Sequence, residues 1–417
     1  MVERLAIEDG KPVRRKKFPE YHAIVDQREI KAVTKVLKSR GPWRRGPVVE
    51  QYERDLEKHF GVRHALAVSN GTVALHVAMA ALGLRPGDEV VTTPYTFVAS
   101  ASAALYQNAI PMFADIDPGS YNLDPSQAEK AITDHTKGIV VVHLAGHPAD
   151  MDPFLEIAQK QNIWIIEDTA QASGALYKGR LAGTIANVGT FSTVDGKIMS
   201  TGEGGFCLTN DYELAERMGS IHNFFRAHAT SNIHEFYGIG YNYRMTEFQA
   251  AIGREQLKKL DRMVETRRRN AAYLTKRLRE VKGVSPPSEA PWAKHAFYYY
   301  ALRIDTKALG VTREQFEKAL TAEGIPISRG RSTPLVHKTE LFRKRIGYGG
   351  TGCPFACPHR PDPIDYENQS FFVAESVDRE VFWLTDALPI LGRQDMDDIV
   401  TAVEKLASVF LKRTECA

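Results

Sequence analysis

The chain has 417 residues, of which 43% are hydrophobic and 25% are charged, and its formal net charge is +3. This composition is typical of a globular protein, and the length favours two domains over a single core. A nearly balanced charge gives no reason to expect a nucleic-acid partner, and no stretch approaches the roughly 20 apolar residues of a membrane span.

The amino-terminal end and the cysteines favour the cytoplasm. Residues 1–17 are polar and basic, and they lack the apolar core of a secretion signal. The chain has 4 cysteines, too few for a disulfide scaffold at this length. We therefore expect a cytoplasmic protein.

The first half of the chain alternates between helical and strand periods. Residues 1–30 are predicted to form an extended arm. Predicted helices follow at 49–60, 72–82, 98–106, 126–133 and 151–161, and predicted strands at 65–68, 89–91, 111–114, 138–142 and 163–166, where the series closes. Because these strands are apolar on both faces, the alternation predicts an α/β fold with a mostly parallel sheet covered by helices. Ligands of such sheets bind at the carboxyl ends of the strands.

The second half predicts a smaller unit. Apolar residues at helical intervals predict one long amphipathic helix over 256–281, of the kind that often bridges two domains. A strand at 297–304, a helix at 312–322, a loop at 344–370 and a final helix at 394–411 favour an α+β domain. We therefore predict an arm (1–30), a large cofactor-binding domain (31–255), a connecting helix (256–282) and a small C-terminal domain (283–417).

Two local patterns have plain interpretations. Arg267–Arg269 is predicted to be a solvated helix face rather than a nucleic-acid patch. Cys353, Cys357 and His359 could bind a metal, but the cysteines are four positions apart and no second cysteine pair exists. We expect a proline-rich surface loop there and no metal site.

Lys197 and Asp168 carry the chemical prediction. Lys197 lies in a turn with four glycines between residues 196 and 205, and Asp168 ends the apolar run of the last predicted strand. A lysine amine can hold an aldehyde cofactor as a Schiff base, and a buried carboxylate keeps a basic ring nitrogen protonated. The pair indicates pyridoxal phosphate. The alternative is a surface lysine and an acid that caps the next turn.

Other residues match the remaining parts of this cofactor. Gly71 and Thr72 begin a helix directly after a strand, where backbone N–H groups bind phosphate. Simple N-capping by Asn70 is a compatible alternative. Ser192, five residues before the lysine, is a second candidate for the phosphate.

The cofactor ring needs two further contacts. Gln171, three residues after Asp168, could donate a hydrogen bond to the phenolic oxygen of the ring. Phe97 follows a predicted strand and could stack on the ring face. From the sequence alone, ordinary core packing is the favoured interpretation of Phe97.

Together these segments resemble the DegT/StrS family of sugar and cyclitol aminotransferases, which have fold type I. The matching segments are SNGTVAL (69–75), PYTFVAS (94–100), HLAGHPADMD (143–152), EDTAQA (167–172), TGEGG (201–205) and GYNYRMT (240–246). Each is weak alone, but the six in this order are specific, and the resemblance covers nearly the whole chain.

The resemblance implies a role for each site residue. The Schiff-base lysine of the family falls on Lys197, the ring-nitrogen partner on Asp168 and the phenolic-oxygen contact on Gln171. The phosphate contacts fall on Gly71, Thr72 and Ser192, and the stacking ring falls on Phe97. Asn242 matches a residue that reaches the phosphate from the neighbouring subunit, so the resemblance implies a homodimer with shared active sites.

Some segments bear on the substrate. Many family members read Phe-Ser-Phe, two more residues and then Ser or Thr before the lysine, whereas this chain reads FSTVDGK over 191–197. The serine-to-lysine spacing is kept, so the departure concerns substrate preference more than cofactor binding. Residues 5–13, 372–375 and 381–384 are similar to the cyclitol (inosose) branch.

The resemblance implies transfer of an amino group from glutamate or glutamine to a keto-cyclitol or keto-sugar, by ping-pong kinetics. A dehydratase and a non-catalytic regulator remain alternatives. Relatives that dehydrate sugars carry histidine at the position of Lys197, and a regulator need not keep every cofactor contact. Candidates for the rest of the pocket are Trp43, Arg44, Arg45, Arg329 and Arg331, since arginines suit a diphosphate or the carboxylate of the donor.

Overall fold

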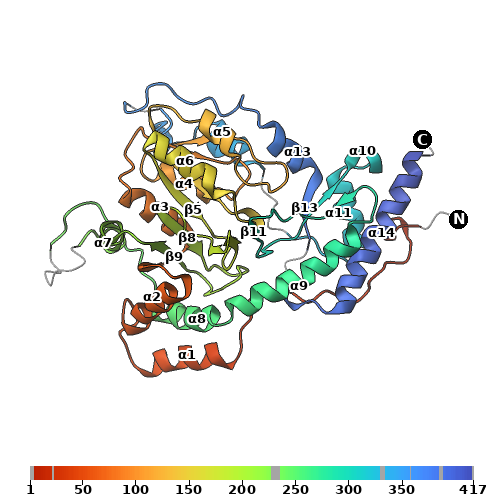
Figure 1. Ribbon diagram of the computed structural model, residues 1–417, viewed down its shortest axis with the longest axis horizontal. Helices are drawn as coiled ribbons and strands as arrows, with labels where there is room; N and C mark the ends of the chain where they lie inside the picture. The colour runs from red at the N-terminus through yellow and green to blue at the C-terminus, as the bar shows by residue number, and fades with distance from the viewer. Residues whose placement is uncertain are drawn as a thin grey trace.

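A sheet of seven strands forms the centre of the larger half of the molecule in the computed structural model (Figure 1), which describes residues 4–20, 23–226, 235–328, 334–356, 358–384 and 388–415. The strands are β1 (His64–Val68), β2 (Glu89–Thr92), β3 (Ile110–Phe113), β4 (Thr136–Val142), β5 (Trp164–Asp168), β8 (Val188–Ser192) and β9 (Gly205–Thr209), in the order β1-β9-β8-β5-β4-β2-β3. β9 is antiparallel to both of its neighbours, and the remaining neighbours are paired in parallel. The predicted mostly parallel sheet is confirmed.

The prediction that the series of strands closes at residue 166 is wrong, because β8 and β9 follow. The sequence of β8 is not an apolar run: it contains Gly189, Thr190 and Ser192. Gly189 is needed because a Cβ there would lie 2.0 Å from the carbonyl oxygen of Gly183. The residues of β8 are therefore selected for close backbone packing, and the strand lacks the apolar run from which the other strands were predicted.

Helices cover both faces of the sheet. The helices of the larger half are α1 (Gln27–Lys38), α2 (Pro47–Phe60), α3 (Gly71–Ala81), α4 (Ala99–Leu105), α5 (Pro125–Lys130), α6 (Met151–Gln161), α7 (Tyr212–Ile221) and α8 (Glu247–Leu257). α3, α4 and α7 share a core with alternate strand residues such as Val90, Val140 and Ile166. α5 and α6 pack on the opposite face, with Ile139 and Ile165. The predictions missed α1, α7 and all but the last two residues of α8, while α2 to α6 lie where the periodicity placed helices.

The predicted single helix over 256–281 is interrupted near its start. α8 ends at Leu257, and α9 (Leu260–Leu278) begins after a break at Lys258 and Lys259. The side chain of Lys259 is buried and forms ion pairs with Asp26 and Glu29 at the start of α1. From there α9 runs from the larger half to α14 (Figure 1).

The smaller half contains a three-stranded antiparallel sheet. Its strands are β10 (Val284–Ser285), β12 (Ala301–Ile304) and β13 (Val381–Trp383), and its helices are α10 (Thr306–Leu309), α11 (Arg313–Ala322), α13 (Phe372–Glu380) and α14 (Arg393–Glu415). The strand predicted at 297–304 is present only as β12, which begins at Ala301. A second three-stranded sheet consists of β6 (Leu176–Tyr177), β7 (Arg180–Leu181) and β11 (Ala293–Lys294).

Two segments pack away from their neighbours in sequence. Leu5, near the amino terminus, lies in the core of the smaller half, and Glu323 of that half accepts hydrogen bonds from the N–H groups of Ala6 and Val13. Conversely, Tyr366 donates a hydrogen bond of 2.7 Å to the carbonyl of Pro111 in β3, and Phe355 is fully buried with it. The stretch at 344–370, predicted as a loop, therefore packs against the larger half and buries part of its own side chains there. The predicted domain boundaries follow sequence order, whereas the packing interleaves the two ends of the chain.

The prediction of a solvated arginine run is wrong for its first member. Arg267 on α9 is 1% exposed, and its Nη1 donates to the carbonyls of Phe297 and Tyr298 at 3.1 and 3.2 Å. Arg269 is exposed. Of the helices in the described ranges, none is long and apolar enough to cross a membrane.

Candidate active site

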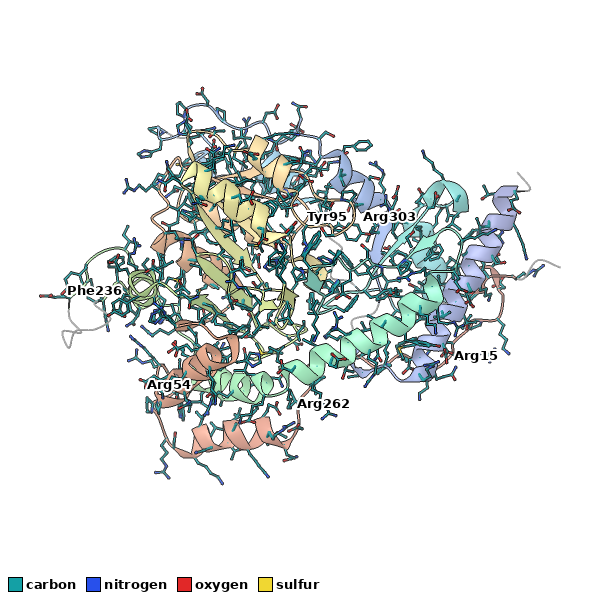
Figure 2. The ribbon with its side chains drawn as sticks, viewed as in Figure 1. Arg15, Arg54, Tyr95, Phe236, Arg262 and Arg303 are labelled. Atoms are coloured by element: carbon teal, nitrogen blue, oxygen red, sulfur yellow. The ribbon has the colours of Figure 1, made fainter. Side chains whose placement is uncertain are left out.

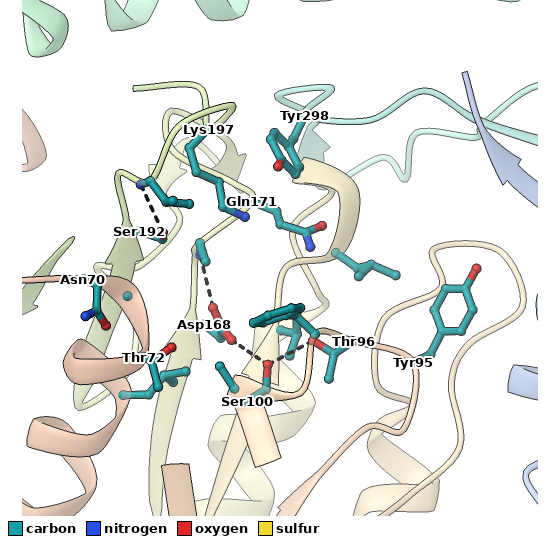
Figure 3. Close-up of a pocket in the computed structure, with 18 of the residues that line it drawn as sticks. Asn70, Thr72, Tyr95, Thr96, Ser100, Asp168, Gln171, Ser192, Lys197 and Tyr298 are labelled. Carbon is teal, nitrogen blue, oxygen red and sulfur yellow. Dashed lines mark hydrogen bonds between the residues drawn. The ribbon is translucent and has the colours of Figure 1, made fainter. Parts of the chain in front are cut away.

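A pocket of about 800 Å³ lies where the carboxyl ends of the parallel strands meet the smaller half of the molecule. Asn70 follows β1, Asp168 ends β5 and Ser192 ends β8, and all three line the pocket. Tyr298 and Trp383 close it from the smaller half. Figure 2 shows Tyr95 at this junction of the two halves, and Figure 3 shows Lys197, Asp168 and Gln171 around one space. The pocket therefore lies at the strand ends, where the sheet topology predicts a ligand.

Lys197 enters the pocket from the turn between β8 and β9. Its backbone N–H donates to the carbonyl of Val194, which closes the turn, and Gly196 and Gly202 adopt positive φ angles of 84°. The side chain is half-buried, and Nζ lies 4.6 Å from the centroid of the Tyr298 ring. No ion pair holds this amine within the described part of the chain, so it is available to an aldehyde.

Asp168 is 6% exposed and lies across the pocket floor from the lysine. Its Oδ2 accepts a hydrogen bond of 2.7 Å from Ser100 Oγ, and its Oδ1 accepts one of 3.2 Å from the N–H of Ala170. Each oxygen keeps a lone pair for a further donor. A protonated ring nitrogen in the pocket would be such a donor.

Glu167, the neighbour of Asp168, has a structural role and does not line the pocket. Successive residues of a strand face opposite sides of the sheet, and Glu167 is fully buried away from the pocket. Its carboxylate accepts from His143 Nε2 and from the N–H groups of Gly183, Ile185 and Ala186 at 2.7–3.0 Å. Burial raises the pKa of Glu167, but the hydrogen bonds from His143, Ala186 and Gly183 outweigh it, and the pKa lies below its usual value. The two adjacent acids thus divide into a structural and a pocket carboxylate.

The start of α3 forms a cradle for an anion. Asn70 caps the helix by accepting from the N–H of Val73 at 2.9 Å. The N–H groups of Gly71 and Thr72 make no hydrogen bond to any residue of the described ranges and are free for a ligand. A Cβ on Gly71 would lie 2.6 Å from the Cβ of Ser192, so only glycine allows the two segments to meet. The predicted phosphate residues therefore converge at one helix start.

Gln171 and Phe97 both line the pocket. Gln171 Oε1 accepts from the N–H of Ala145 at 2.7 Å, which leaves the amide NH₂ of this pocket-lining side chain as the donor. Phe97 lines the pocket and is 60% exposed. The favoured interpretation of Phe97 as core packing is therefore wrong: its ring is an uncovered platform in the pocket.

Other predicted residues lie outside the pocket. Asn242 is exposed, does not line the pocket, and pairs with Asn223 in an isolated bridge. Trp43, Arg44 and Arg45 are exposed and line no part of the pocket either, with Trp43 packed on Phe248. Arg329 and Arg331 lie outside the described residues.

Sequence reasoning missed Ser100 and Tyr298. Ser100 lies within the PYTFVAS segment and is the second residue of α4, so its place in a matched segment was an available signal. Tyr298 belongs to a run of three tyrosines that was assigned to a strand. The irregular backbone at Phe297, whose φ is +50°, turns Tyr298 into the pocket instead.

The described residues contain no group of three potential metal ligands. Cys353 forms no disulfide with another described cysteine, and Cys357 lies outside the described residues. The pocket fits pyridoxal phosphate, because four features occur together: an amine without an ion pair to any described residue, a carboxylate with spare lone pairs, N–H groups at a helix start without a described partner, and an uncovered aromatic ring.

Comparison with known proteins agrees with this geometry. The sequence profile of the DegT/DnrJ/EryC1/StrS aminotransferase family matches residues 23–404. A putative L-glutamine:3-amino-2,3-dideoxy-scyllo-inosose aminotransferase of Streptoalloteichus tenebrarius is 35% identical over 414 residues, which cover 97% of this chain and 98% of that protein. GDP-perosamine synthase of Caulobacter vibrioides is 39% identical over 298 residues, covering 71% and 78%. The crystal structure of 3-amino-5-hydroxybenzoic acid synthase is similar with a TM-score of 0.81 at 28% identity, covering 96% and 100%.

Proposed function

Because the chain belongs to the DegT/DnrJ/EryC1/StrS aminotransferase family, we propose that it moves an amino group from glutamine or glutamate to the keto group of a cyclitol. It is a pyridoxal-phosphate-dependent aminotransferase of fold type I that acts in aminosugar or aminocyclitol biosynthesis. The choice of a cyclitol acceptor is supported by inosose aminotransferases that match 97% of this chain.

One observation carries the catalytic part of the proposal: Lys197 and Asp168 line one pocket with a phosphate cradle at Gly71. The cofactor, when bound, supplies an aldehyde that takes up the donor amine and a ring that withdraws electrons from the carbon losing its proton. The protein must then hold this ring, keep its nitrogen protonated and move the proton.

Asp168 and the start of α3 would hold the two ends of the cofactor. The carboxylate of Asp168, which accepts a hydrogen bond from Ser100, would pair with the ring nitrogen and favour its protonated form. The N–H groups of Gly71 and Thr72 would bind the phosphate at the positive end of the helix dipole. Gln171 would donate its NH₂ to the phenolic oxygen, and Phe97 would support the ring face.

Lys197 would attach the cofactor through its amine and, once the donor amine replaced it, would act as general base and then as general acid. Its Nζ would take the proton from the α-carbon of the donor and carry it within the pocket. Lys197 would do this from the turn between β8 and β9, where its Nζ has no competing ion pair in the part of the chain that the structure describes.

We also propose that the protein is a homodimer in which Asn242 completes the partner's pocket. Asn242 is exposed and lies outside its own pocket. The segment that precedes it carries exposed apolar side chains, including Phe236 and Ile239, which are 58% and 82% exposed. Figure 2 shows Phe236 at the end of the molecule farthest from the smaller half. Exposed apolar groups of this kind favour burial against another subunit.

The experiment that tests the function supplies purified protein and pyridoxal phosphate with glutamine or glutamate, and with an inosose or a nucleotide-linked keto-sugar. We expect the cofactor absorbance to change with the donor alone and to recover when the inosose is added. The Lys197→Ala variant is the control and should lose both changes. Recovery with the nucleotide-linked sugar only would contradict the cyclitol proposal, and an unchanged cofactor spectrum with every donor would contradict the aminotransferase mechanism.

A further inference from the structure

Tyr298 presents the face of its ring to the amine of Lys197. Nζ lies 4.6 Å from the ring centroid, within the distance at which an aromatic face attracts an ammonium group. Tyr298 itself is 9% exposed, and both residues line the pocket. Since no described carboxylate forms an ion pair with this amine, the ring is its main electrostatic contact.

The backbone of Tyr298 is held from two sides. On one side, the buried guanidinium of Arg267 donates to the carbonyls of Phe297 and Tyr298. On the other side, Tyr299 N–H donates to the carbonyl of Ala145 at 3.1 Å. A Cβ on Gly146 would lie 2.9 Å from the nitrogen of Tyr298, so this loop also approaches closely. The ring is therefore placed by packing rather than by the flexible lysine.

We propose, on the basis of the proposed function, that Tyr298 is the residue that holds the amine of Lys197 whenever this amine is not attached to the cofactor. A released lysine side chain has many rotamers, and most of them point its nitrogen away from the carbon atoms between which it moves a proton. The face of the Tyr298 ring attracts the ammonium form and keeps Nζ in the pocket. No new bond forms in this step: the ring only orients the group that carries the proton.

The ring, and not the phenolic hydroxyl, makes this contact. The hydroxyl of Tyr298 instead accepts a hydrogen bond of 3.3 Å from the hydroxyl of Tyr299. Two substitutions therefore separate the roles. Tyr298→Phe keeps the ring and removes the hydroxyl, whereas Tyr298→Leu keeps an apolar side chain and removes the ring.

The first test measures the amine without any catalysis. The full-length chain, freed of cofactor, is treated briefly with a water-soluble acetylating reagent, and acetylation of Lys197 is followed by mass spectrometry, with exposed Lys137 on β4 as the internal reference. We expect Tyr298→Leu to raise the labelling rate of Lys197 about 3- to 10-fold, since it uncovers the amine and removes the attraction for its charged form. Tyr298→Phe should stay within about 2-fold of the unchanged protein. Equal rates for Lys197 in Tyr298→Leu and the unchanged protein would overturn the proposal.

The second test uses the enzyme loaded with cofactor. We expect Tyr298→Leu to slow the glutamine-driven change in cofactor absorbance about tenfold at saturating donor, and Tyr298→Phe to restore most of the rate. A loss in Tyr298→Leu that appears only as a higher KM, with kcat unchanged, would contradict a role in holding the lysine. The labelling result does not depend on transamination. If the unchanged protein transferred no amine, the proposed function would fail while the contact with Lys197 could still be measured.

Discussion

Ser100 Oγ donates a hydrogen bond of 2.7 Å to Oδ2 of Asp168, and both side chains are buried. The contact joins α4 to the end of β5, two segments that are 68 positions apart in sequence. Thr96 Oγ1 lies a further 2.9 Å from Ser100 Oγ (Figure 3). Because an ionised carboxylate only accepts, Ser100 donates to Asp168, and its own oxygen is then open to the hydroxyl of Thr96. The two hydroxyls therefore form an ordered chain that ends at the pocket carboxylate that we propose holds the cofactor ring.

We expect Ser100→Ala to weaken cofactor binding. The substitution removes a charge-assisted hydrogen bond to a buried carboxylate, with a cost of about 1–3 kcal/mol. A titration of the cofactor-free chain with pyridoxal phosphate should show a dissociation constant raised about tenfold or more. Ser102→Ala, on the same helix, is the matched control and should bind as the unchanged protein does. Identical affinities for both variants would show that the hydrogen bond does not orient Asp168.

We expect Gly71→Ala to lose the phosphate site. A Cβ at this position would lie 2.6 Å from the Cβ of Ser192 and would push the start of α3 away from β8. Overpacking of this kind costs about 1–3 kcal/mol of the free energy of unfolding, and the displaced N–H groups would bind inorganic phosphate and the cofactor more weakly. Gly119→Ala is the control, since a Cβ there would meet only Asp117 Oδ1 at 3.4 Å. The measurements are thermal unfolding and equilibrium titration, and full cofactor affinity in Gly71→Ala would contradict the close-approach argument.

We expect Glu167→Gln to destabilise the fold rather than to block chemistry directly. The buried carboxylate accepts four hydrogen bonds, and an amide NH₂ would face one or more of these donors. Breaking such a buried charged network costs about 3–5 kcal/mol. Glu156→Gln on the exposed face of α6 is the control, and it should change the free energy of unfolding by less than about 0.5 kcal/mol.

The same residue makes stability depend on pH. Burial raises the pKa of Glu167, but its hydrogen bonds outweigh this, so the pKa in the folded protein lies below the unfolded value. The stabilisation is therefore complete above the unfolded pKa, near 4.5, and is lost as the pH falls through the folded pKa. Urea unfolding at several pH values between about 7 and 3.5 should show a shallower acid decline for Glu167→Gln than for the unchanged protein. Parallel curves would mean that Glu167 does not contribute to acid unfolding.

The sequence allowed the parallel sheet and most pocket residues to be predicted, because strands that are apolar on both faces and polar residues at their ends are local signals. Lys197, Asp168, Gly71 and Ser192 are examples, and the structure brings them together. The role of Phe97 could not be decided locally, since an aromatic ring after a strand looks the same in a core and in a pocket. Its exposure depends on the position of the smaller half, which is set by long-range packing.

Arg267 shows a second limit of sequence reasoning. Three consecutive arginines have the same local pattern, yet the turn of the helix places Arg267 toward the core and Arg269 toward solvent. The partners of Arg267 are backbone carbonyls about thirty residues away, and backbone groups leave no trace in the residue pattern. Nor could β8 be identified, because its glycine and hydroxyl residues serve close packing and the pocket rather than an apolar face.

We expect Arg267→Met to lower the free energy of unfolding much more than Arg269→Met does. The first leaves the carbonyls of Phe297 and Tyr298 without their buried donor, which costs about 1–3 kcal/mol. The second changes an exposed side chain and should stay within about 0.5 kcal/mol. Urea unfolding measures both, and equal stability of the two variants would contradict the buried position of Arg267.

The shared active site can be tested by mixing two inactive or weakened variants. Lys197→Ala removes the reacting amine, and Asn242→Ala removes the side chain that we propose enters the partner's pocket. In a mixed dimer, one pocket then receives Lys197 from the Asn242→Ala chain and Asn242 from the Lys197→Ala chain, whereas the other pocket has neither. We expect variants unfolded and refolded together to regain activity, up to about a quarter of that of the unchanged enzyme: statistical mixing makes half of the dimers mixed, and each mixed dimer has one of its two sites intact.

The control is the same mixture without the refolding step, which keeps the parent dimers separate and should regain nothing. If Asn242 instead acted within its own chain, every pocket of the mixed dimer would carry one defect, and refolding would yield no more activity than the sum of the parents. Activity measured before and after exchange, with the fraction of mixed dimers determined by native mass spectrometry, separates these cases. Recovery that rises in proportion to the mixed dimer would place Asn242 at the pocket of the neighbouring subunit.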